Sequence, residues 1–438
     1  MNSEAAAITA ELDRKQIPRR RWRIAWLLGL GVLINYFDRV NLSVSHSAML
    51  ATFGISDVTF GILSSAYNWT YALCQIPIGV VLDWLGVRRV GRISTLLWSL
   101  ASFGAAAAPN IPSFFAARLV LGAGEAPTFP ANAKAIGNWF PQEERSFATS
   151  YFDAAAKFAS AIGVPLIGIL LLHIGWRMSF AATGLASLLY FLLFYVVYRE
   201  PETDSRLSPE EFALIRAHST PEEDEPTRQE SLGYLLRQRR VLGLALGFGS
   251  YNYVFYLLLV WLPTYLSESM HINLLDSFLY TGVPWLVATV TDLLIGGWLV
   301  DVLIQRGWNP NRVRMVVLVG GTAMGLGILG AAHSHSASGA LVWISVCIGG
   351  LSAAAPVGWS FPSLIAPRSS VGRVGGIMNF SNQVSGIAAS IITGILVQRW
   401  HSFAAAFAVA AGYLAAGICA YLFLLRSADP IEPESPAD

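Results

Sequence analysis

The chain has 438 residues, of which 54% are hydrophobic and only 13% are charged, and its formal net charge is +1. This charged share is about half of what soluble domains usually carry, so the composition nearly excludes a soluble globular enzyme and excludes a disordered chain. The lack of a basic excess also argues against a nucleic-acid-binding protein. An apolar run of about 20 residues would be long enough to span a bilayer.

Twelve such runs follow one another, so the sequence predicts an all-α membrane protein with twelve transmembrane helices. A polar linker at 199–240 separates six runs from six. The other expected domains are a tail at 1–23, six-helix halves at 24–198 and 241–426, and a tail at 427–438. The expected helices lie at 24–46, 57–82, 90–108, 111–137, 146–172, 176–198, 241–266, 275–304, 312–333, 338–366, 372–397 and 401–426.

The positive residues predict the orientation of these helices. Of the 29 Lys and Arg residues, 23 fall on one set of loops, two (Arg177 and Arg399) on the opposite set, and four within the apolar runs. Cytoplasmic loops of membrane proteins carry the excess of Lys and Arg. Both termini and the linker are therefore expected in the cytoplasm, which requires an even number of crossings.

The two halves also contain a repeated motif. The sequence GVVLDWLGVRR at 79–89 follows the second run, and GGWLVDVLIQRGWNPNR at 296–312 follows the second run of the second half. In each copy an aspartate, Asp83 or Asp301, comes four residues after a glycine, with arginine downstream. Two parallel six-helix halves with a binding site at their interface are typical of secondary transporters.

Three stretches of the sequence resemble a known family. The GxxxDxxGxRR pattern at 79–89 resembles the signature loop of the major facilitator superfamily. The stretches NYFDRVNLSVS (35–45) and RLVLGAGEAPTFPANAKAIGNWFP (118–141) resemble its anion:cation symporter family. That family includes bacterial hexonate, hexuronate, tartrate and phthalate permeases and animal vesicular and lysosomal anion transporters. The resemblance spans essentially the whole chain and is more specific for the family than for the substrate.

The resemblance implies a major facilitator fold in a multi-pass membrane protein. The first external loop is short, without the extended form of the animal relatives, so we expect a bacterial cytoplasmic (inner) membrane as the location. We expect a monomer. The expected partners are a small carboxylate substrate, protons and the lipid bilayer, with no nucleic acid and no cofactor besides the proton as coupling ion.

Arg39 is the first candidate for substrate binding. A charge in mid-membrane costs at least about 2.5–3.5 kcal/mol, which makes a functional role the default expectation. Asp38 and Arg39 are adjacent in sequence and therefore about 100° apart around a helix, so they need not pair with each other. A guanidinium can hold a substrate carboxylate through two hydrogen bonds. The alternative is a buried structural ion pair.

Arg118 and Glu125 are candidates for proton coupling, together with Asp38. Arg118 and Glu125 lie nearly two turns apart and so share one face of a helix. We expect Arg118 to pair with Asp38, Glu125 or both. A buried carboxylate with an exchangeable arginine partner can load and release a proton. The resemblance implies that Asp38 and Glu125 are the proton-coupling carboxylates, although a structural role is the alternative.

Lys157 leaves two interpretations open. It lies four residues after Asp153, a spacing that allows a direct ion pair. The sugar-acid permeases that the chain resembles tend to have an uncharged polar residue here. Lys157 is therefore either a second cation that contacts substrate and favours a dianion, or a partner of Asp153 alone. Asp292 has no obvious local partner and is either a coupling site or a polar residue facing the cavity.

Uncharged residues in the apolar runs complete the candidate binding site. Tyrosine and asparagine can recognise substrate hydroxyls, but helix–helix packing is an equally good explanation for each. Asn252 and Tyr256 share a helix face by their spacing. The resemblance places Tyr71, Trp359 and Asn379 near the site. The candidates for substrate contact are Arg39, Tyr71, Lys157, Asn252, Tyr256, Trp359 and Asn379.

The repeated loop supplies candidates for gating. In the superfamily that the chain resembles, this loop locks the outward-facing state from the cytoplasmic side. Its aspartate can sit against a helix N-terminus, where negative charge is favoured, and pair with arginine. The gating candidates are Gly79, Asp83, Arg88, Arg89 and Asp301.

These features predict a proton-coupled importer of a small organic anion, such as a hexonate, hexuronate or related carboxylate, that works by alternating access. An exporter or exchanger of such anions is one alternative. A transporter-like ligand sensor is another, and it would predict a large signalling extension. An enzyme is not expected, since the sequence has no nucleophile–base pair, metal cluster or nucleotide-binding motif.

Overall fold

The computed structural model describes residues 18–141, 145–217, 230–366 and 370–431, and these residues form helices without a β-strand. The first half has six membrane crossings built from five helical segments. Two of these segments each hold two crossings, one segment forms a single crossing, and the remaining two segments together form one broken crossing. A short helix, α3 (His46–Phe53), follows the first crossing. The five segments are α2 (Arg20–Val44), α4 (Asp57–Ala107), α5 (Ile111–Glu125), α6 (Thr128–Trp139) and α7 (Arg145–Val197).

Single glycines reverse the chain inside α4 and α7. Gly86 has φ +74° and ψ 164°, and Gly175 has φ +77° and ψ 166°. Residues with a Cβ avoid this region of backbone conformation, whereas glycine adopts it readily. The expected runs 57–82 and 90–108 are therefore joined by a turn at Gly86, which is the second glycine of the signature-like loop.

The second half contains six further crossings. Several of them change their helical pitch along their length, and the π-helical segments η3, η4 and η7 continue the α-helices that precede them. The linker between the halves contributes the short helices η2 (Pro201–Thr203), α8 (Pro209–Ala217) and α9 (Leu232–Leu235). The segments of the second half are α10 (Arg239–Thr264), η3 (Tyr265–Ser269), α11 (Leu274–Thr291), η4 (Asp292–Leu299), α12 (Val300–Gln305), α13 (Pro310–Met324), η5 (Gly325–Gly327), α14 (Ile328–Ala332), α15 (Ala337–Ile365), α16 (Val371–Trp400), α17 (Ala404–Ala420) and η7 (Tyr421–Leu425).

The described helices agree with the predicted twelve-helix architecture. Seven of them are long and apolar enough to cross a membrane on length and composition alone, or up to eight if one bent pair counts as a single span. In this number Tyr151–Val197, one continuous segment that holds two crossings, counts once.

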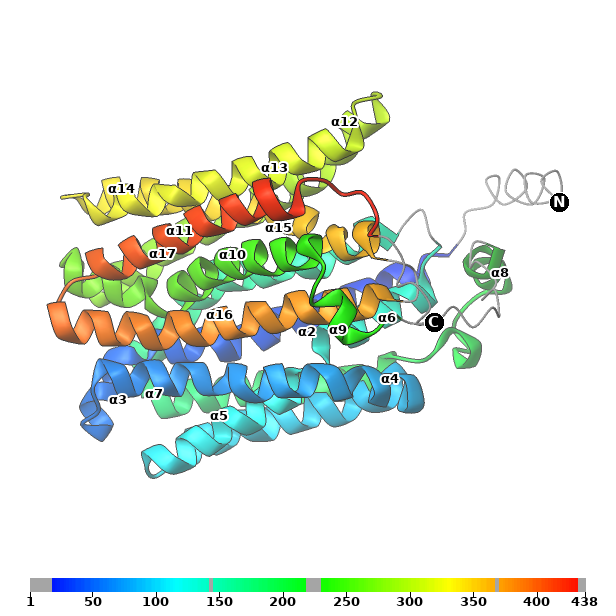
Figure 1. Cartoon of the computed structure of the whole chain (residues 1–438). Coiled ribbons are helices and arrows are strands. Elements are labelled where there is room, and N and C mark those ends of the chain that lie inside the picture. The colour runs from blue at the N-terminus through cyan, green and yellow to red at the C-terminus, as the bar shows by residue number, and fades with distance from the viewer. Residues whose placement is uncertain (1–17, 142–144, 218–229, 367–369, 432–438) are drawn as a thin grey trace.

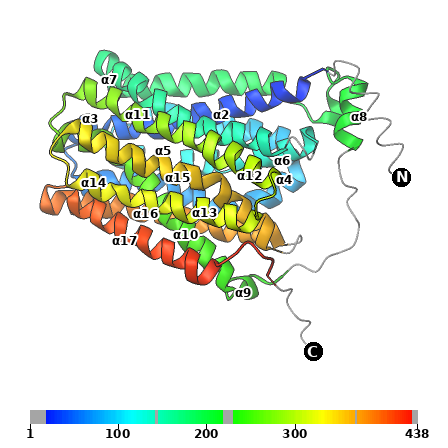
Figure 2. The same cartoon turned by 90° about the horizontal axis from the view of Figure 1, so that it is seen from above.

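The helices lie roughly side by side as one bundle, with α2–α7 on one side and α10–α17 on the other (Figure 1, Figure 2). Within the first half, α2 packs on α7 and α4 on α5; within the second, α10 packs on α16 and α11 on α15. Between the halves, α4 contacts α16, α7 contacts α11 and α2 contacts α10. These three pairs of helices belong to the interface between the two halves.

Close contacts join the halves at the end of the bundle near α3, which is the end expected to face outward. The Ser43 hydroxyl donates to the Val260 carbonyl at 2.6 Å, and the Val58 main-chain N–H donates to Gln398 at 3.3 Å. A Cβ on Gly61 would lie only 2.5 Å from the Ser390 carbonyl oxygen. The two halves therefore pack backbone to backbone at this end.

The linker is attached to the opposite end of the bundle. Arg20 pairs with Asp204 at 2.9 Å, and Arg21 pairs with Glu211 at 3.0 Å, with all four side chains buried. The Glu211 carboxylate also accepts from the main-chain N–H groups of Arg20 and Arg21 in the first turn of α2. A carboxylate at this place is favoured by the helix dipole, so Glu211 of the linker caps the N-terminus of α2.

Candidate functional site

A buried ion pair lies at the centre of the candidate site. The Arg39 Nε atom in α2 is 3.1 Å from Oε2 of Glu125, and both side chains are buried. Glu125 is the last residue of α5, and the crossing breaks there because Pro127 has no N–H to continue the helical ladder. A Cβ on Gly124 would lie 2.9 Å from the main-chain N of Trp98, so this part of α5 packs closely on α4.

Tyrosine rings surround the Arg39 guanidinium. Its Cζ atom is 4.5 Å from the ring centroid of Tyr36, 4.7 Å from that of Tyr67 and 5.5 Å from that of Tyr71. Such distances permit cation–π attraction. Tyr36 and Tyr67 were not among the sequence candidates, although Tyr36 lies three residues before Arg39 and Tyr67 four before Tyr71, spacings that place each pair on one helix face.

A small cavity of about 20 Å³ adjoins Arg39 at the interface of the two halves. Arg118 and Tyr67 from the first half and Tyr256 from the second half contribute to its wall. Of the sequence candidates, Tyr71 lies close to Arg39 by its ring distance and Tyr256 by its place in the cavity wall. The lining residues are Arg39, Leu42, Ser43, Ser64, Tyr67, Arg118, Tyr256, Leu259 and Val260.

Hydroxyl groups, rather than an arginine, hold the Asp38 carboxylate. The Ser102 hydroxyl donates to Oδ1 at 2.8 Å and the Ser187 hydroxyl donates to Oδ2 at 3.1 Å. Arg118 donates to the main-chain carbonyl of Asp38 at 3.5 Å. In the described part of the chain, no ion pair joins Arg118 to a carboxylate, so the expected pairing was wrong. The partner of Glu125 is Arg39, which reaches it from another helix.

A second charged cluster lies between the halves and consists of Asp153, Lys157 and Asp292. The Lys157 Nζ atom in α7 is 2.6 Å from Oδ2 of Asp153 and 2.7 Å from Oδ2 of Asp292 in η4. Asp292 therefore does have a partner, which the sequence did not indicate because it lies on a distant helix. The interpretation that Lys157 pairs with Asp153 alone was wrong, since it also pairs with Asp292, and its contact with substrate stays a prediction.

The remaining uncharged candidates differ in their surroundings. The Asn252 side chain donates to the Asn382 carbonyl at 2.5 Å and so ties α10 to α16. The Trp359 ring packs edge-on against Phe248 at 5.2 Å, and the Trp359 side chain is 42% exposed. Asn379 is half-buried in α16.

The gating candidates lie near the turn at Gly86 and its counterpart in the second half. The Asp83 side chain and Gly79 fall outside the residues whose surroundings are described. The Arg88 main-chain N–H donates to Glu200 at 3.1 Å, which ties this turn to the end of α7. Arg89 and Asp301 are exposed. Glu200, which was not expected here, is thus brought to this loop.

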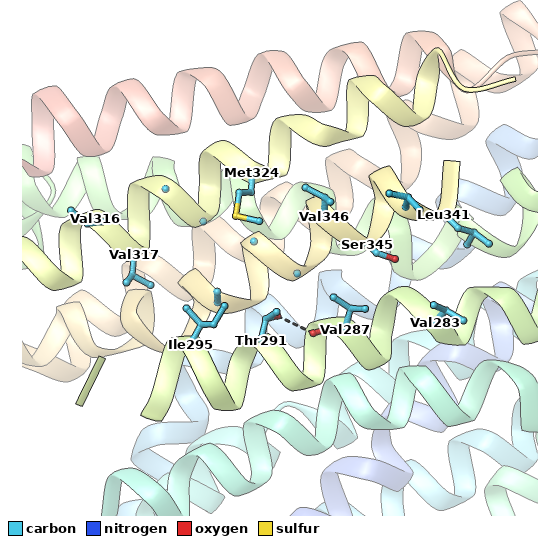
Figure 3. Close-up of a pocket in the computed structure, with 16 residues that line it drawn as sticks. Val283, Val287, Thr291, Ile295, Val316, Val317, Met324, Leu341, Ser345 and Val346 are labelled. Carbon is cyan, nitrogen blue, oxygen red and sulfur yellow. Dashed lines mark hydrogen bonds between the residues drawn. The ribbon is translucent and has the colours of Figure 1, made fainter. Parts of the chain in front are cut away.

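A larger cavity than the one beside Arg39 lies within the second half between α11, η4, α13 and α15, and has a volume of about 490 Å³ (Figure 3). Its wall is made of residues such as Val287, Ile295, Val316 and Met324, and none of the lining residues is charged. The Thr291 hydroxyl in this wall donates to the Val287 carbonyl at 3.0 Å. A carboxylate would find no charged partner there, so this cavity does not fit an organic anion.

Comparisons with known proteins identify the family. The model of the Major Facilitator Superfamily matches residues 28–390. The uncharacterized transporter YybO of Bacillus subtilis is 36% identical, over 97% of this chain and 98% of its own. The D-galactonate transporter of Escherichia coli is 29% identical over 93% and 96% of the two chains, and the probable galactarate/D-glucarate transporter GudP of Bacillus subtilis is 28% identical over 97% and 95%.

Solved structures show the same fold. A bacterial homologue of the human lysosomal transporter Spinster, in an inward-facing and occupied conformation, aligns with a TM-score of 0.73 at 16% identity, covering 96% of this chain and all of the other. The D-xylose–proton symporter aligns with a TM-score of 0.71 at 18% identity, covering 92% and 97%. The relatives are consistent with the anion:cation symporters that the sequence resembles. The chain belongs to the Major Facilitator Superfamily and is a multi-pass membrane transporter, not an enzyme.

Proposed function

We propose that the protein imports a small sugar-acid anion together with protons, by rocking its two halves, 24–198 and 241–426, about the site at Arg39. Relatives are named as transporters of galactonate and of galactarate or glucarate. The observation that carries the proposal is the buried Arg39–Glu125 ion pair, which lies beside residues of both halves. The chain offers there a cation suited to a carboxylate and a carboxylate suited to a proton.

Exchange of partners at Arg39 would link anion binding to proton binding. Arg39 Nη2 and Glu125 Oε1 are buried and have no hydrogen-bond partner among the described residues. A substrate carboxylate can accept hydrogen bonds from the guanidinium in place of Glu125. A buried carboxylate that loses its only cationic partner is strongly destabilised. Glu125 therefore takes up a proton when the anion binds and releases it when the anion leaves.

Asp38 provides the second proton site of the proposal. Its carboxylate lies on the side of α2 that faces Ser102 and Ser187, with Arg118 bonded to its main-chain carbonyl. A hydroxyl can accept from a protonated carboxyl as readily as it donates to an ionised one. Asp38 can therefore change its protonation state while its neighbours stay in place, and Arg118 keeps positive charge beside the site in both states.

The contacts between the halves support an inward-facing state. Backbone contacts close the end near α3, which is the outer end according to the distribution of Lys and Arg. In this state the substrate would leave toward the cytoplasm. Rocking of the halves would break these outer contacts. It would also bring together the turn at Gly86 and the segment around Asp301, which would then close the cytoplasmic end of the bundle.

Counterflow in proteoliposomes tests the proposal. Purified protein is loaded with one unlabelled acid and offered labelled acids from a panel of hexonates, hexuronates, dicarboxylates and aromatic acids. We expect exchange of a sugar acid, and accumulation when the outside is made acidic. Exchange without any effect of the pH gradient would favour an exchanger, and the absence of exchange for every carboxylate would refute the proposal.

A further inference from the structure

The second charged cluster, Asp153–Lys157–Asp292, lies across the interface of the two halves. Asp153 and Lys157 belong to α7 in the first half, and Asp292 begins the π-helical segment η4 in the second half. Lys157 lies 2.6 Å from Asp153 and 2.7 Å from Asp292, so one ammonium group bridges both carboxylates. π-helical turns within α-helices occur frequently at functional sites.

The charges of this cluster do not balance. One lysine faces two aspartates, so the ionised cluster carries a net charge of −1 within the membrane-spanning region. The side chains of Lys157 and Asp292 are 4% and 0% exposed, so water does not screen this charge. A buried uncompensated charge is strongly destabilising. One proton bound to either carboxylate would make the cluster neutral.

The surroundings of the two carboxylates select Asp292 as the group that binds this proton. The Asp153 side chain is 16% exposed, which leaves it partly hydrated, whereas that of Asp292 is fully buried. Asp292 Oδ1 has no hydrogen-bond partner among the described residues. An ionised carboxylate is destabilised most where it has neither water nor donors. We propose that Asp292 is a third proton-binding carboxyl of this transporter, additional to Asp38 and Glu125.

No other described charge near Asp292 removes the imbalance. Two tyrosines interact electrostatically with the cluster, Tyr251 from α10 and Tyr36 from α2, and both are neutral when protonated. The helix α15 packs on η4 and has no Asp, Glu, Lys, Arg or His in its sequence. Along the same crossing, Asp276 and Asp301 lie toward the two ends of the span.

Protonation of Asp292 would also weaken a link between the halves. The ionised Asp292 holds Lys157 across the interface through a buried ion pair. A neutral carboxyl attracts the ammonium group much less, and Lys157 then keeps Asp153 as its ionic partner. Protonation of Asp292 would thus loosen the interface between α7 and η4, which must move against each other when the halves rock. This step rests on the proposed function, because only a proton-coupled carrier would use it for transport.

Infrared difference spectroscopy tests proton binding directly on the purified full-length chain in lipid, with no substrate present. The carbonyl band of protonated buried carboxyls is followed as the pH is changed. We expect the wild type to show a component that is lost in Asp292→Asn and kept in Asp276→Asn, the matched control at the outer end of the same span. An unchanged band in Asp292→Asn would overturn the proposal.

Chemical labelling of the wild type provides a second test that needs no variant to fold. Dicyclohexylcarbodiimide enters the bilayer and forms a stable adduct with protonated carboxyls, and mass spectrometry locates that adduct. We expect an adduct on Asp292 that increases as the pH falls. An adduct on Asp153 alone, or none on Asp292 at any pH, would overturn the assignment. Because neither readout requires transport, a failed counterflow assay would count against the proposed function alone.

Discussion

The Arg39 guanidinium meets the carboxylate of Glu125 at 3.1 Å, although the two residues lie on different helices and 86 positions apart in sequence. The three tyrosine rings around Arg39 leave this ion pair shielded from water. A buried pair of this kind is strongly affected when one partner changes. The substrate anion and the ionised Glu125 carboxylate are therefore expected to compete for Arg39, so that anion binding favours protonation of Glu125.

Glu125→Gln should uncouple transport from the proton gradient. The amide is close in size to the carboxyl and resembles its protonated form, so exchange of substrate should continue. Accumulation driven by an acidic exterior should be lost. Counterflow and pH-driven uptake, measured on the same proteoliposomes, separate the two effects. Glu202→Gln serves as the control, since Glu202 pairs with Arg216 on the exposed surface; unchanged accumulation in Glu125→Gln would contradict this prediction.

Arg39→Ala should both abolish anion binding and destabilise the protein. It leaves the buried Glu125 carboxylate without its cation, and breaking a buried pair in this way costs about 3–5 kcal/mol. Arg39→Ala combined with Glu125→Gln should recover part of that loss in stability without recovering binding. Thermal unfolding in detergent and equilibrium binding of the transported acid give the two measurements. A double variant no more stable than Arg39→Ala would show that the pair does not contribute as expected.

Gly86→Ala should destabilise the turn inside α4. The backbone there has φ +74° and ψ 164°, which a residue with a Cβ adopts at a cost of about 1–3 kcal/mol. We expect a lower Tm and a lower yield of folded protein. Gly412→Ala in α17 is the matched control, since no atom lies within 4 Å of its added Cβ and alanine favours the helix. Equal stability of the two variants would argue against the role of Gly86.

His46→Ala should loosen the contact between the halves at the end near α3. The buried His46 ring has Nε2 2.8 Å from Asp57 in its own half and Nδ1 3.7 Å from Glu268 in the other. It also packs edge-on against Phe60 and against Trp261 of the second half, at 4.6 and 5.5 Å. Loss of these contacts should favour opening at this end.

A membrane-impermeant maleimide measures that opening. Cys74, Cys347 and Cys419 are first replaced by serine, and a single cysteine is introduced at Ser64, which lines the cavity beside Arg39. Labelling from outside should be faster in His46→Ala than in the parent with His46. Slower or equal labelling would mean that this histidine does not hold the end closed.

The sequence by itself determined the class of the protein and predicted the membrane depth of its charges. Twelve apolar runs, the repeat around Asp83 and Asp301, and the uneven spread of Lys and Arg are local or periodic properties, so they can be read without a structure. The same holds for the choice of Arg39, Glu125 and Lys157 as unusual residues, because a charge inside an apolar run is costly wherever its partner lies.

Only the tertiary structure decided which of these charges meet. Glu125 pairs with Arg39 rather than Arg118, and Asp292 pairs with Lys157 of the other half. Helix periodicity fixes the face on which a side chain lies but not the neighbour that this face meets. That neighbour depends on how helices distant in sequence pack together, and close packing at glycines such as Gly124 brings their side chains within bonding distance.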